Sequence, residues 1–271
     1  MRAADGTVYL VGAGPGAPDL LTLRAARLLA RADVVFHDAL VHPDTLALAV
    51  RARIVAVGKR SGQHSTAQRF IHKRLLDAAR THAIVVRLKG GDPMLFGRAQ
   101  EEIAALEAAG VRYEIVPGVT AAMAAAADLR TSLTVRGSVR SFTFVTPRAG
   151  DDGPASGWLA ALRQADAGAI YMGLREAPAI ACALMDAGHA PATPVAIVAD
   201  ASLPSARIRR TTLANLAEHA QWAQGAPALV LVGPQFRDRA APSGARVRPE
   251  PRSAERRAAS EPRPASAARC A

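Results

Sequence analysis

Short apolar runs alternate with longer amphipathic segments along most of this chain, and no other feature restricts its fold as much. Runs such as Val8–Val11 and Ala83–Leu88 are too short for buried helices, and a glycine follows each of them within two residues. A short apolar run bounded by a turn residue is typical of a buried strand. The alternation therefore predicts the α/β class with a largely parallel sheet.

The pattern breaks at Pro117-Gly118, which separates two halves. The expected strands are Val8–Val11, Val34–His37, Ile54–Val57, Ala83–Leu88 and Tyr113–Val116 in the first half, and Ser141–Thr146, Ala169–Met172, Val195–Val198 and Ala228–Val232 in the second. Helices are expected between them, including one that runs without a break from Pro18 to about Arg31. We therefore expect two α/β domains with mostly parallel strands, residues 1–117 and 118–236. A disordered tail rich in Arg, Pro and Ala should follow at 237–271.

The charge of the chain favours an anionic small-molecule partner over nucleic acid. The formal net charge is +11, and nine arginines against four acids place +5 of it in residues 237–271. The +6 that remains on the body suits an anionic substrate. Binding of nucleic acid is not expected, because no aromatic residue follows Phe236 and aromatics make up only 4% of the chain.

Cysteine content and hydropathy exclude further classes. The two cysteines, Cys182 and Cys270, are too few for a disulfide framework or a metal site, so no metal is expected. No apolar run approaches the roughly 20 residues that a membrane helix needs. The chain enters its first strand without a leader-like segment. We expect a soluble cytoplasmic protein with no membrane partner.

Glycine-rich loops follow three of the expected strands. They are Gly12–Gly16, Lys89–Pro93 and Tyr171–Gly173. Ligands of open α/β sheets bind beyond the carboxyl ends of the strands, where such loops let a ligand approach the main chain. These loops are therefore the candidate binding site.

The first loop approximates a dinucleotide fingerprint. Pro15 removes one backbone donor that a pyrophosphate cradle uses, while Asp38 stands where an acid contacts the ribose. A nicotinamide-dependent dehydrogenase is therefore one alternative on the residues alone.

Six motifs in order are much more specific than one loop. They are VGAGPGAPDLLTLRAA, HDALV, VGKRSGQHS, RLKGGDPMLFGRAQEE, VPGVTAA and YMG. Together they resemble the uroporphyrinogen-III C-methyltransferases of the tetrapyrrole methylase family, in the form that carries this activity alone. Asp38–Leu40, Gly58–Arg60 and Phe96–Arg98 are the stretches that point to this member of the family.

The resemblance implies a fold, a reaction and a cofactor. Two α/β domains with the active site in a cleft between them would form a homodimer. The enzyme would transfer two methyl groups from S-adenosylmethionine to uroporphyrinogen III, giving precorrin-2 for sirohaem or cobalamin and releasing S-adenosylhomocysteine. The implied cofactor contacts are Pro15, Gly90, Gly91, Asp92, Leu95, Thr120, Ala121, Met172 and Ala201.

The resemblance also implies catalytic residues. It assigns the proton acceptor to Asp38 and the proton donor to Lys59, and it adds Arg98 as a third catalytic residue. A carboxylate at Asp38 also suits a second role, in which it hydrogen-bonds pyrrole N–H groups and stabilises a cationic macrocycle. On the residues alone, a helix N-cap is a third interpretation of Asp38.

Arginines are expected to bind the substrate carboxylates, because the planar guanidinium binds a carboxylate through two hydrogen bonds. Arg60 lies inside a matching motif, and Arg136 is a candidate from the second half. Glu101 is expected to orient Arg98 from one helical turn away.

The second half departs from the family pattern at three positions. Val135 and Arg148 stand where the family has histidines, and Ala201 replaces a glycine. These departures leave a divergent methylase acting on a later precorrin or a related tetrapyrrole as the main alternative.

Overall fold

Two five-stranded sheets form the framework of the computed structural model, which describes residues 6–58, 68–148 and 157–238. The first sheet contains β1 (Thr7–Gly12), β2 (Val34–His37), β3 (Arg53–Ala56), β4 (Ile84–Lys89) and β5 (Arg112–Val116). Its strand order is β3-β2-β4-β1-β5, and all its pairings are parallel. The five strands expected in the first half are confirmed to within one residue at most ends.

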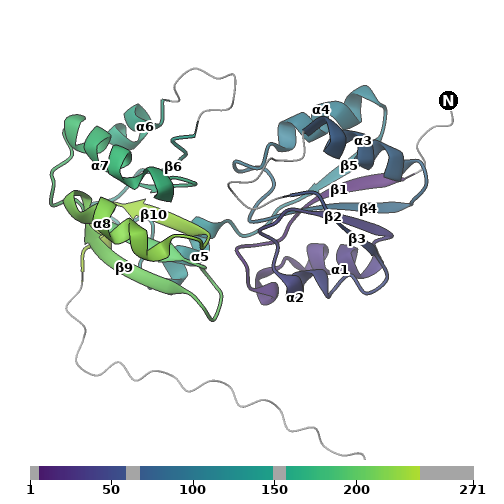
Figure 1. Cartoon of the computed structure of the whole chain (residues 1–271), viewed down its shortest axis with the longest axis horizontal. Helices are drawn as coiled ribbons and strands as arrows, with labels where there is room; N and C mark the ends of the chain where they lie inside the picture. Colours follow the sequence, from purple (N-terminus) through teal and green to yellow (C-terminus); the bar gives the residue numbers. More distant parts are fainter. Residues whose placement is uncertain (1–5, 59–67, 149–156, 239–271) are drawn as a thin grey trace, which may run out of the picture. The chain divides into compact units, whose positions relative to one another are not determined.

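Helices cover both faces of this sheet (Figure 1). They are α1 (Leu23–Arg31), α2 (Pro43–Leu46), α3 (Gln68–Ala79) and α4 (Ala99–Ala108). Ile71 of α3 and Ile103 of α4 share one core cluster with Leu10 of β1. Leu29 of α1 belongs to the cluster on the opposite face, with Val86 of β4. Burial on both faces explains why the central strands β1, β2 and β4 consist mostly of apolar residues.

The second sheet is mixed. It contains β6 (Phe142–Val145), β7 (Ala167–Ile170), β8 (Pro194–Ala199), β9 (Arg207–Thr212) and β10 (Ala228–Val232), in the order β6-β7-β10-β8-β9. Only β6 and β7 pair in parallel, and the other pairings are antiparallel. The α/β class is therefore confirmed, but mostly parallel pairing holds for the first sheet and not for the second.

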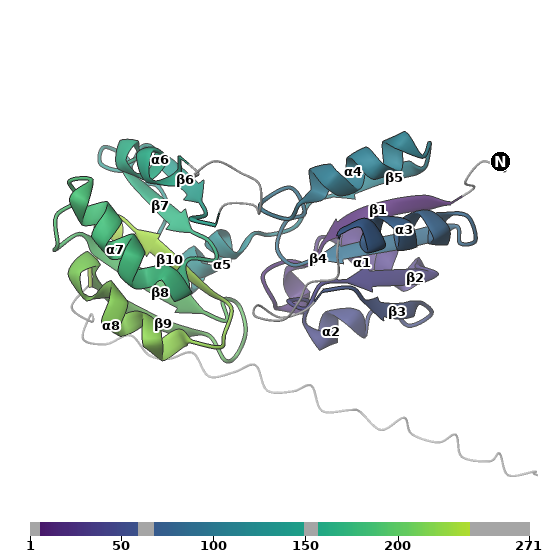
Figure 2. The same cartoon turned by 45° about the horizontal axis from the view of Figure 1, so that its top comes forward.

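Helices also pack on both faces of this second sheet (Figure 2). They are α5 (Ala121–Asp128), α6 (Trp158–Gln164), α7 (Ala177–Asp186) and α8 (Leu216–Ala220). One core cluster joins α6, α7 and α8 to one face of the sheet. A second cluster joins α5 to the other face, together with the 3-10 helix Pro234–Phe236.

Two expectations for the second half were wrong in detail. Strand β9 was not expected, because RIRRTT contains a single apolar residue and lies at the sheet edge, where a strand needs no buried run. The strand expected at Ala169–Met172 begins at Ala167, because Gly168 belongs to it. A Cβ at Gly168 would stand 2.3 Å from Leu162 Cδ1, so glycine there lets α6 pack closely.

The helix expected from Pro18 to Arg31 is also interrupted. A 3-10 turn spans Pro18–Leu20, and Leu21 and Thr22 are extended. The Thr22 hydroxyl accepts a hydrogen bond from Ala25 N (3.2 Å), so Thr22 is the N-cap of α1.

By contacts between residues, the chain up to Asp238 forms one compact unit. The boundary between residues 117 and 118 therefore stays a prediction. Residues 239–271, which make up most of the predicted tail, lie outside the described part. None of the helices in the described residues is long and apolar enough to cross a membrane.

Candidate active site

The carboxyl ends of β1 and β4 lie side by side at the centre of the first sheet. From β1 the chain continues through α1 to β2, on one side, and from β4 it continues through α4 to β5, on the other. Adjacent parallel strands whose connections leave in opposite directions define the position where open α/β sheets bind ligands. The loops Gly12–Gly16 and Lys89–Pro93 follow these two strands, as expected from the sequence.

The two loops are paired through their backbones. Gly14 N donates to Gly91 O (3.2 Å), and Gly91 N donates to Gly14 O (2.7 Å). Ala13 N donates to Lys89 O (2.7 Å). Gly14 and Gly91 have φ of 73° and 68°, a conformation that favours glycine. The pairing holds the main chain of both loops in one arrangement.

A third loop joins them at the end of β5. An added Cβ at Gly118 would stand 2.3 Å from Gly91 O and 2.9 Å from Gly12 Cα. We call Gly12, Gly91 and Gly118 the glycine junction, because a Cβ at Gly12 or Gly118 would collide with the backbone of the other two loops and Gly91 has the positive φ that favours glycine. Its members come from the ends of three neighbouring strands, β1, β4 and β5.

Asp92 ties the loop after β4 to this junction. Its Oδ2 accepts from Gly118 N (2.9 Å), and its Oδ1 accepts from Met94 N (2.8 Å). Both carboxylate oxygens therefore bond to the backbone, while the negative charge stays at the candidate cofactor site.

Tyr171, at the end of β7, organises the start of α5. Its hydroxyl lies 2.8 Å from Thr120 Oγ1 and accepts from Ala122 N at 3.1 Å. Its ring packs against Phe96, with 5.1 Å between ring centroids. Burial raises the pKa of the Tyr171 hydroxyl, so it stays protonated. The sequence did not single out this residue.

Met172 and the loop after β8 have unusual backbone conformations. Met172, Asp200 and Ser202 have φ of 57°, 51° and 72°. Strained non-glycine backbone of this kind concentrates at binding and catalytic sites. The Met172 side chain is exposed, whereas Ala201 is buried and its methyl group belongs to the core cluster that contains α5.

The loop after β8 also contacts the first glycine-rich loop. Ser202 Oγ accepts from Ala17 N (3.0 Å), and Ser202 N donates to Asp128 Oδ2 (2.8 Å). A Cβ at Gly16 would stand 3.0 Å from the Leu203 side chain. The loops assigned to the cofactor in the two halves of the chain are therefore in contact.

Asp38 follows β2 and forms an ion pair with Arg87. Its Oδ1 accepts from Arg87 Nη2 (2.5 Å), and its side chain is 29% exposed. Asp38 is not a helix N-cap: the N-cap of the next helix, α2, is His42, and the Asp38 carboxylate bonds to the arginine side chain of β4.

Behind this pair lie two further buried charges. Arg87 Nε donates to Glu102 Oε1 (3.0 Å), and Lys89 Nζ lies 3.0 and 3.1 Å from the two oxygens of Glu102. Arg87 and Lys89 are each 3% exposed and Glu102 is fully buried. We call Asp38, Arg87, Lys89 and Glu102 the buried charge network.

The network perturbs the two cations in opposite directions. Burial disfavours charge on Arg87, but Asp38 and Glu102 outweigh it, so the Arg87 pKa lies above its ordinary value. Burial and the neighbouring Arg87 hold the Lys89 pKa below its ordinary value, against the opposing effect of Glu102. Arg87 is therefore a permanent cation.

Arg98 and Glu101 form the expected pair. Arg98 Nε and Nη2 donate to the two oxygens of Glu101 at 2.7 and 2.8 Å, and both side chains are exposed. The hydrogen bond from Arg98 is the main reason why the Glu101 pKa is lowered. Arg98 has φ of 54°, at the N-terminus of α4.

Among the predicted substrate ligands, Arg136 is not joined to these loops by any contact within the described residues. Arg136 is exposed on a short turn closed by the bridge between Val135 and Val139. Lys59 and Arg60 lie outside the described residues.

Exposed apolar side chains surround the same strand ends. Leu40, Met94, Phe96 and Met172 are all exposed. A Cβ at Gly90 would stand 3.2 Å from Leu40 Cβ, so Leu40 lies against the loop after β4. Exposed apolar side chains beside convergent polar groups are typical of a small-molecule site.

Sequence reasoning missed Arg87, Lys89 and Glu102. Two cations within an otherwise apolar strand were the available signal, because a buried charge needs a partner. The partner, Glu102, stands beside Glu101 in the motif, and the sequence alone does not say which of the two points inward.

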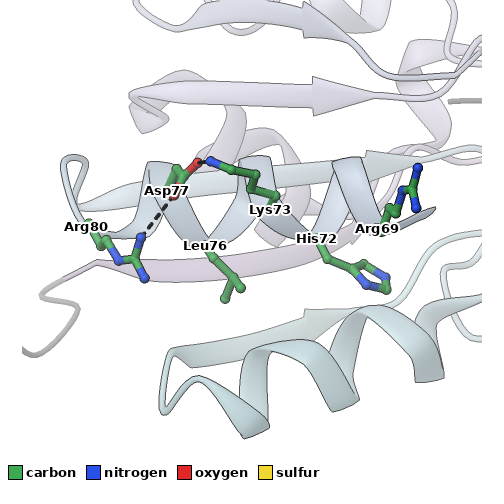
Figure 3. Close-up of a pocket in the computed structure, with 6 residues that line it drawn as sticks. All are labelled: Arg69, His72, Lys73, Leu76, Asp77 and Arg80. Carbon is green, nitrogen blue, oxygen red and sulfur yellow. Dashed lines mark hydrogen bonds and ion pairs between the residues drawn. The ribbon is translucent and has the colours of Figure 1, made fainter. Parts of the chain in front are cut away.

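A separate groove of about 450 Å³ lies on α3 (Figure 3). It is lined by Arg69, His72, Lys73, Leu76, Asp77 and Arg80. Asp77 is paired with Lys73 and Arg80, both exposed, as is typical of a solvated helix face. The groove lies on the outer helix layer and not at the strand ends.

Comparison with known proteins agrees with this geometry. A family model described as Tetrapyrrole (Corrin/Porphyrin) Methylases matches residues 7–217. The chain is 44% identical over 235 residues to a uroporphyrinogen-III C-methyltransferase from Pseudomonas aeruginosa, covering 86% of this chain and 96% of that protein. It is 45% identical over 230 residues to a siroheme synthase from Psychrobacter sp., covering 84% of this chain but 47% of the relative, so it spans about half the length of that enzyme.

A solved structure gives the same result for the fold. The uroporphyrin-III C-methyl transferase from Thermus thermophilus complexed with S-adenyl homocysteine superposes with a TM-score of 0.75 at 40% identity, covering 86% of this chain and 99% of that one. The chain therefore belongs to the tetrapyrrole methylase family.

Proposed function

We propose that this protein is an S-adenosylmethionine-dependent uroporphyrinogen-III C-methyltransferase that adds two methyl groups to give precorrin-2. The observation that carries the proposal is the glycine junction, with its paired loops, at the carboxyl ends of the paired strands β1 and β4. Support comes from the Pseudomonas aeruginosa relative, which this chain matches along almost its whole length. The Thermus thermophilus structure adds that a protein of this fold binds the demethylated cofactor.

The described residues fit this cofactor. Because Gly90 and Gly91 have no side chain, a ligand can approach the main chain there, and Asp92 places a negative charge beside that main chain. We propose that Pro15, Leu95, Thr120, Ala121, Met172 and Ala201 complete the contacts. S-adenosylmethionine supplies an electrophilic methyl group, and an acid beside it offsets its positive charge.

The chain's own residues then orient the substrate. A pyrrole carbon of the macrocycle is already electron-rich, so the protein contributes mainly orientation and exclusion of water. Exposed apolar side chains such as Leu40 and Phe96 suit the faces of the macrocycle. We propose that Arg98, oriented by Glu101, binds a substrate carboxylate, with Arg60 and Arg136 as further carboxylate ligands.

Methyl transfer from a sulfonium leaves positive charge on the macrocycle, and a nearby anion would stabilise that charge. We propose Asp38 for this role because it is the member of the buried charge network that reaches the surface. Lys59 remains the proposed proton donor from the sequence.

The three departures keep a second candidate open. Val135 is exposed beside Arg136, and Arg148 is exposed after β6, so two positions where the family has histidine carry other chemistry at the surface. A methylase of a later precorrin is therefore the alternative. Family membership gives no support to a nicotinamide-dependent dehydrogenase.

Assembly and location extend the proposal. We propose a homodimer, and the apolar hollow of about 640 Å³ over α5 and β6, which includes Met123 and Phe144, is a candidate part of its interface. Sedimentation tests the dimer. Cell fractionation tests the proposed cytoplasmic location.

A binding experiment tests the cofactor assignment separately from turnover. Calorimetric titration of the protein with S-adenosylhomocysteine and, in parallel, with NADPH should give saturable binding for the first ligand only. Binding of NADPH alone would contradict the proposal and favour the dehydrogenase.

A further inference from the structure

The stability of the fold does not explain why the buried charge network is present. Three of its members are at most 3% exposed, and together the four charges sum to zero. Removing such charges from water costs several kcal/mol per ion, and apolar replacements of a complete network are often neutral or stabilising. The presence of the network therefore indicates a role other than holding the fold together.

Its geometry gives Arg87 a single orientation. Nε bonds to Glu102 (3.0 Å) and Nη1 bonds to Leu88 O (3.3 Å), so the planar guanidinium directs Nη2 to Asp38. Glu102 is held in turn by Lys89 from β4 and by Gln68 Nε2 from α3 (3.2 Å). Arg87 and Glu102, which lie behind Asp38, are thus each held by further hydrogen-bond partners.

Only one end of the network reaches the surface. Asp38 is 29% exposed and lies at the carboxyl end of β2, the edge of the sheet that carries the glycine-rich loops. One oxygen of the Asp38 carboxylate is already engaged by the Arg87 guanidinium, whereas the two oxygens of a carboxylate together offer about four acceptor positions. The Asp38 carboxylate remains a good acceptor of hydrogen bonds from a neutral donor.

We propose that Arg87 and Glu102 are positioning residues that hold Asp38 as a fixed anion, which accepts hydrogen bonds from pyrrole N–H groups and stabilises the cationic macrocycle instead of taking its proton. This inference rests on the proposed function and chooses between the two roles that the sequence left open for Asp38. The carboxylate would act by charge and direction, and the meso proton would leave to another acceptor, such as water.

A triple apolar variant separates this role from a structural one. Arg87→Met, Lys89→Met and Glu102→Leu together remove the three buried charges behind Asp38, so the one charge that remains is the carboxylate of Asp38, which is 29% exposed and reached by water. We expect this variant to fold and to bind S-adenosylhomocysteine as the wild type does. Its affinity for uroporphyrin III, an oxidised macrocycle that accepts no methyl group, should fall about 10- to 100-fold, and kcat should fall similarly.

A double-mutant comparison tests whether the network acts through Asp38. Asp38→Asn alone should weaken uroporphyrin III binding by a similar factor, and adding it to the triple variant should cause no further loss. The matched control is Lys73→Gln, Asp77→Asn and Arg80→Gln, which removes one lysine, one acid and one arginine from the exposed face of α3. This control should leave affinity and kcat unchanged.

Several results would overturn the inference. Wild-type porphyrin affinity in the triple variant, losses that add to those of Asp38→Asn, or unchanged porphyrin affinity in Asp38→Asn would each do so. If the triple variant does not fold, Arg87→Lys decides: it keeps the charge but loses the planar fork, so affinity and kcat should still fall, and unchanged values refute the role. A wild type that neither binds nor methylates the macrocycle refutes the proposed function itself.

Discussion

Replacing Gly118 with alanine should damage the candidate cofactor site more than the fold. The new Cβ would stand 2.3 Å from Gly91 O, and ordinary contact begins at 3.4 Å, so the two must separate by about 1.1 Å. Both atoms belong to backbone or are fixed to it, so no side-chain rotation relieves the clash.

The energetic consequence follows from the contacts that such a shift breaks. Gly91 O accepts from Gly14 N at 3.2 Å, and Gly118 N donates to Asp92 at 2.9 Å. Overpacking costs about 1–3 kcal/mol, and each hydrogen bond that breaks adds about 0.5–1.5 kcal/mol. We therefore expect a loss of roughly 2–6 kcal/mol in the free energy of unfolding.

The effect on ligand affinity should be specific. Gly91 and Asp92 are proposed cofactor contacts, so Kd for S-adenosylhomocysteine should rise at least about tenfold, which corresponds to about 1.4 kcal/mol. Urea unfolding gives the stability and calorimetry gives the affinity.

Gly110→Ala is the matched control. Gly110 has φ of 64° and no atom within 4 Å of an added Cβ, and it precedes β5 at the opposite end of the strands. Alanine there should cost about 1–2 kcal/mol through backbone strain and leave the affinity unchanged. Equal affinity in Gly118→Ala and wild type, or equal weakening in Gly110→Ala, would refute the reasoning.

Two further substitutions test the site and its surroundings. Tyr171→Phe removes the hydroxyl that bonds Thr120 and the first turn of α5, so it should weaken S-adenosylhomocysteine binding severalfold. Tyr113→Phe removes an exposed hydroxyl and should leave this affinity unchanged. Equal affinities in the two variants would contradict the role of Tyr171. Asp166→Asn tests how stability depends on pH. Hydrogen bonds from Ser141 hold the Asp166 pKa below its ordinary 3.8. The ionised carboxylate therefore stabilises the folded state above that pH, and this stabilisation is lost as the pH falls. The variant should be less stable than wild type at pH 7, and urea unfolding should show the difference shrinking below pH 3.8; a difference independent of pH would be inconsistent with it.

The central strands of the first sheet were predictable from the sequence because they are buried on both faces. Strand β4 illustrates this, since its apolar run stands out even with two charges inside it. The second sheet was less accessible. Strand β9 lies at an edge of the sheet. Its only apolar residue is one isoleucine among arginines and threonines, so no apolar run indicates a strand there.

The candidate site shows the same limit at the level of side chains. The glycine-rich loops were predictable from the sequence because glycine and proline mark turns, and Gly91 does adopt the conformation that glycine favours. The partners of Asp38 were not visible, because pairing between Arg87 and Glu102 depends on which face of α4 meets β4. The local sequence is enough to predict where the loops lie, whereas tertiary packing determines which charged side chains pair behind them.

The central claim is methyl transfer to uroporphyrinogen III, and the mass of the product tests it most directly. The purified protein is incubated without oxygen with S-adenosylmethionine and enzymatically generated uroporphyrinogen III. The account predicts a product that has gained two methyl groups. A protein that binds the cofactor yet leaves the mass of uroporphyrinogen III unchanged would contradict the claim and move the substrate to a later precorrin.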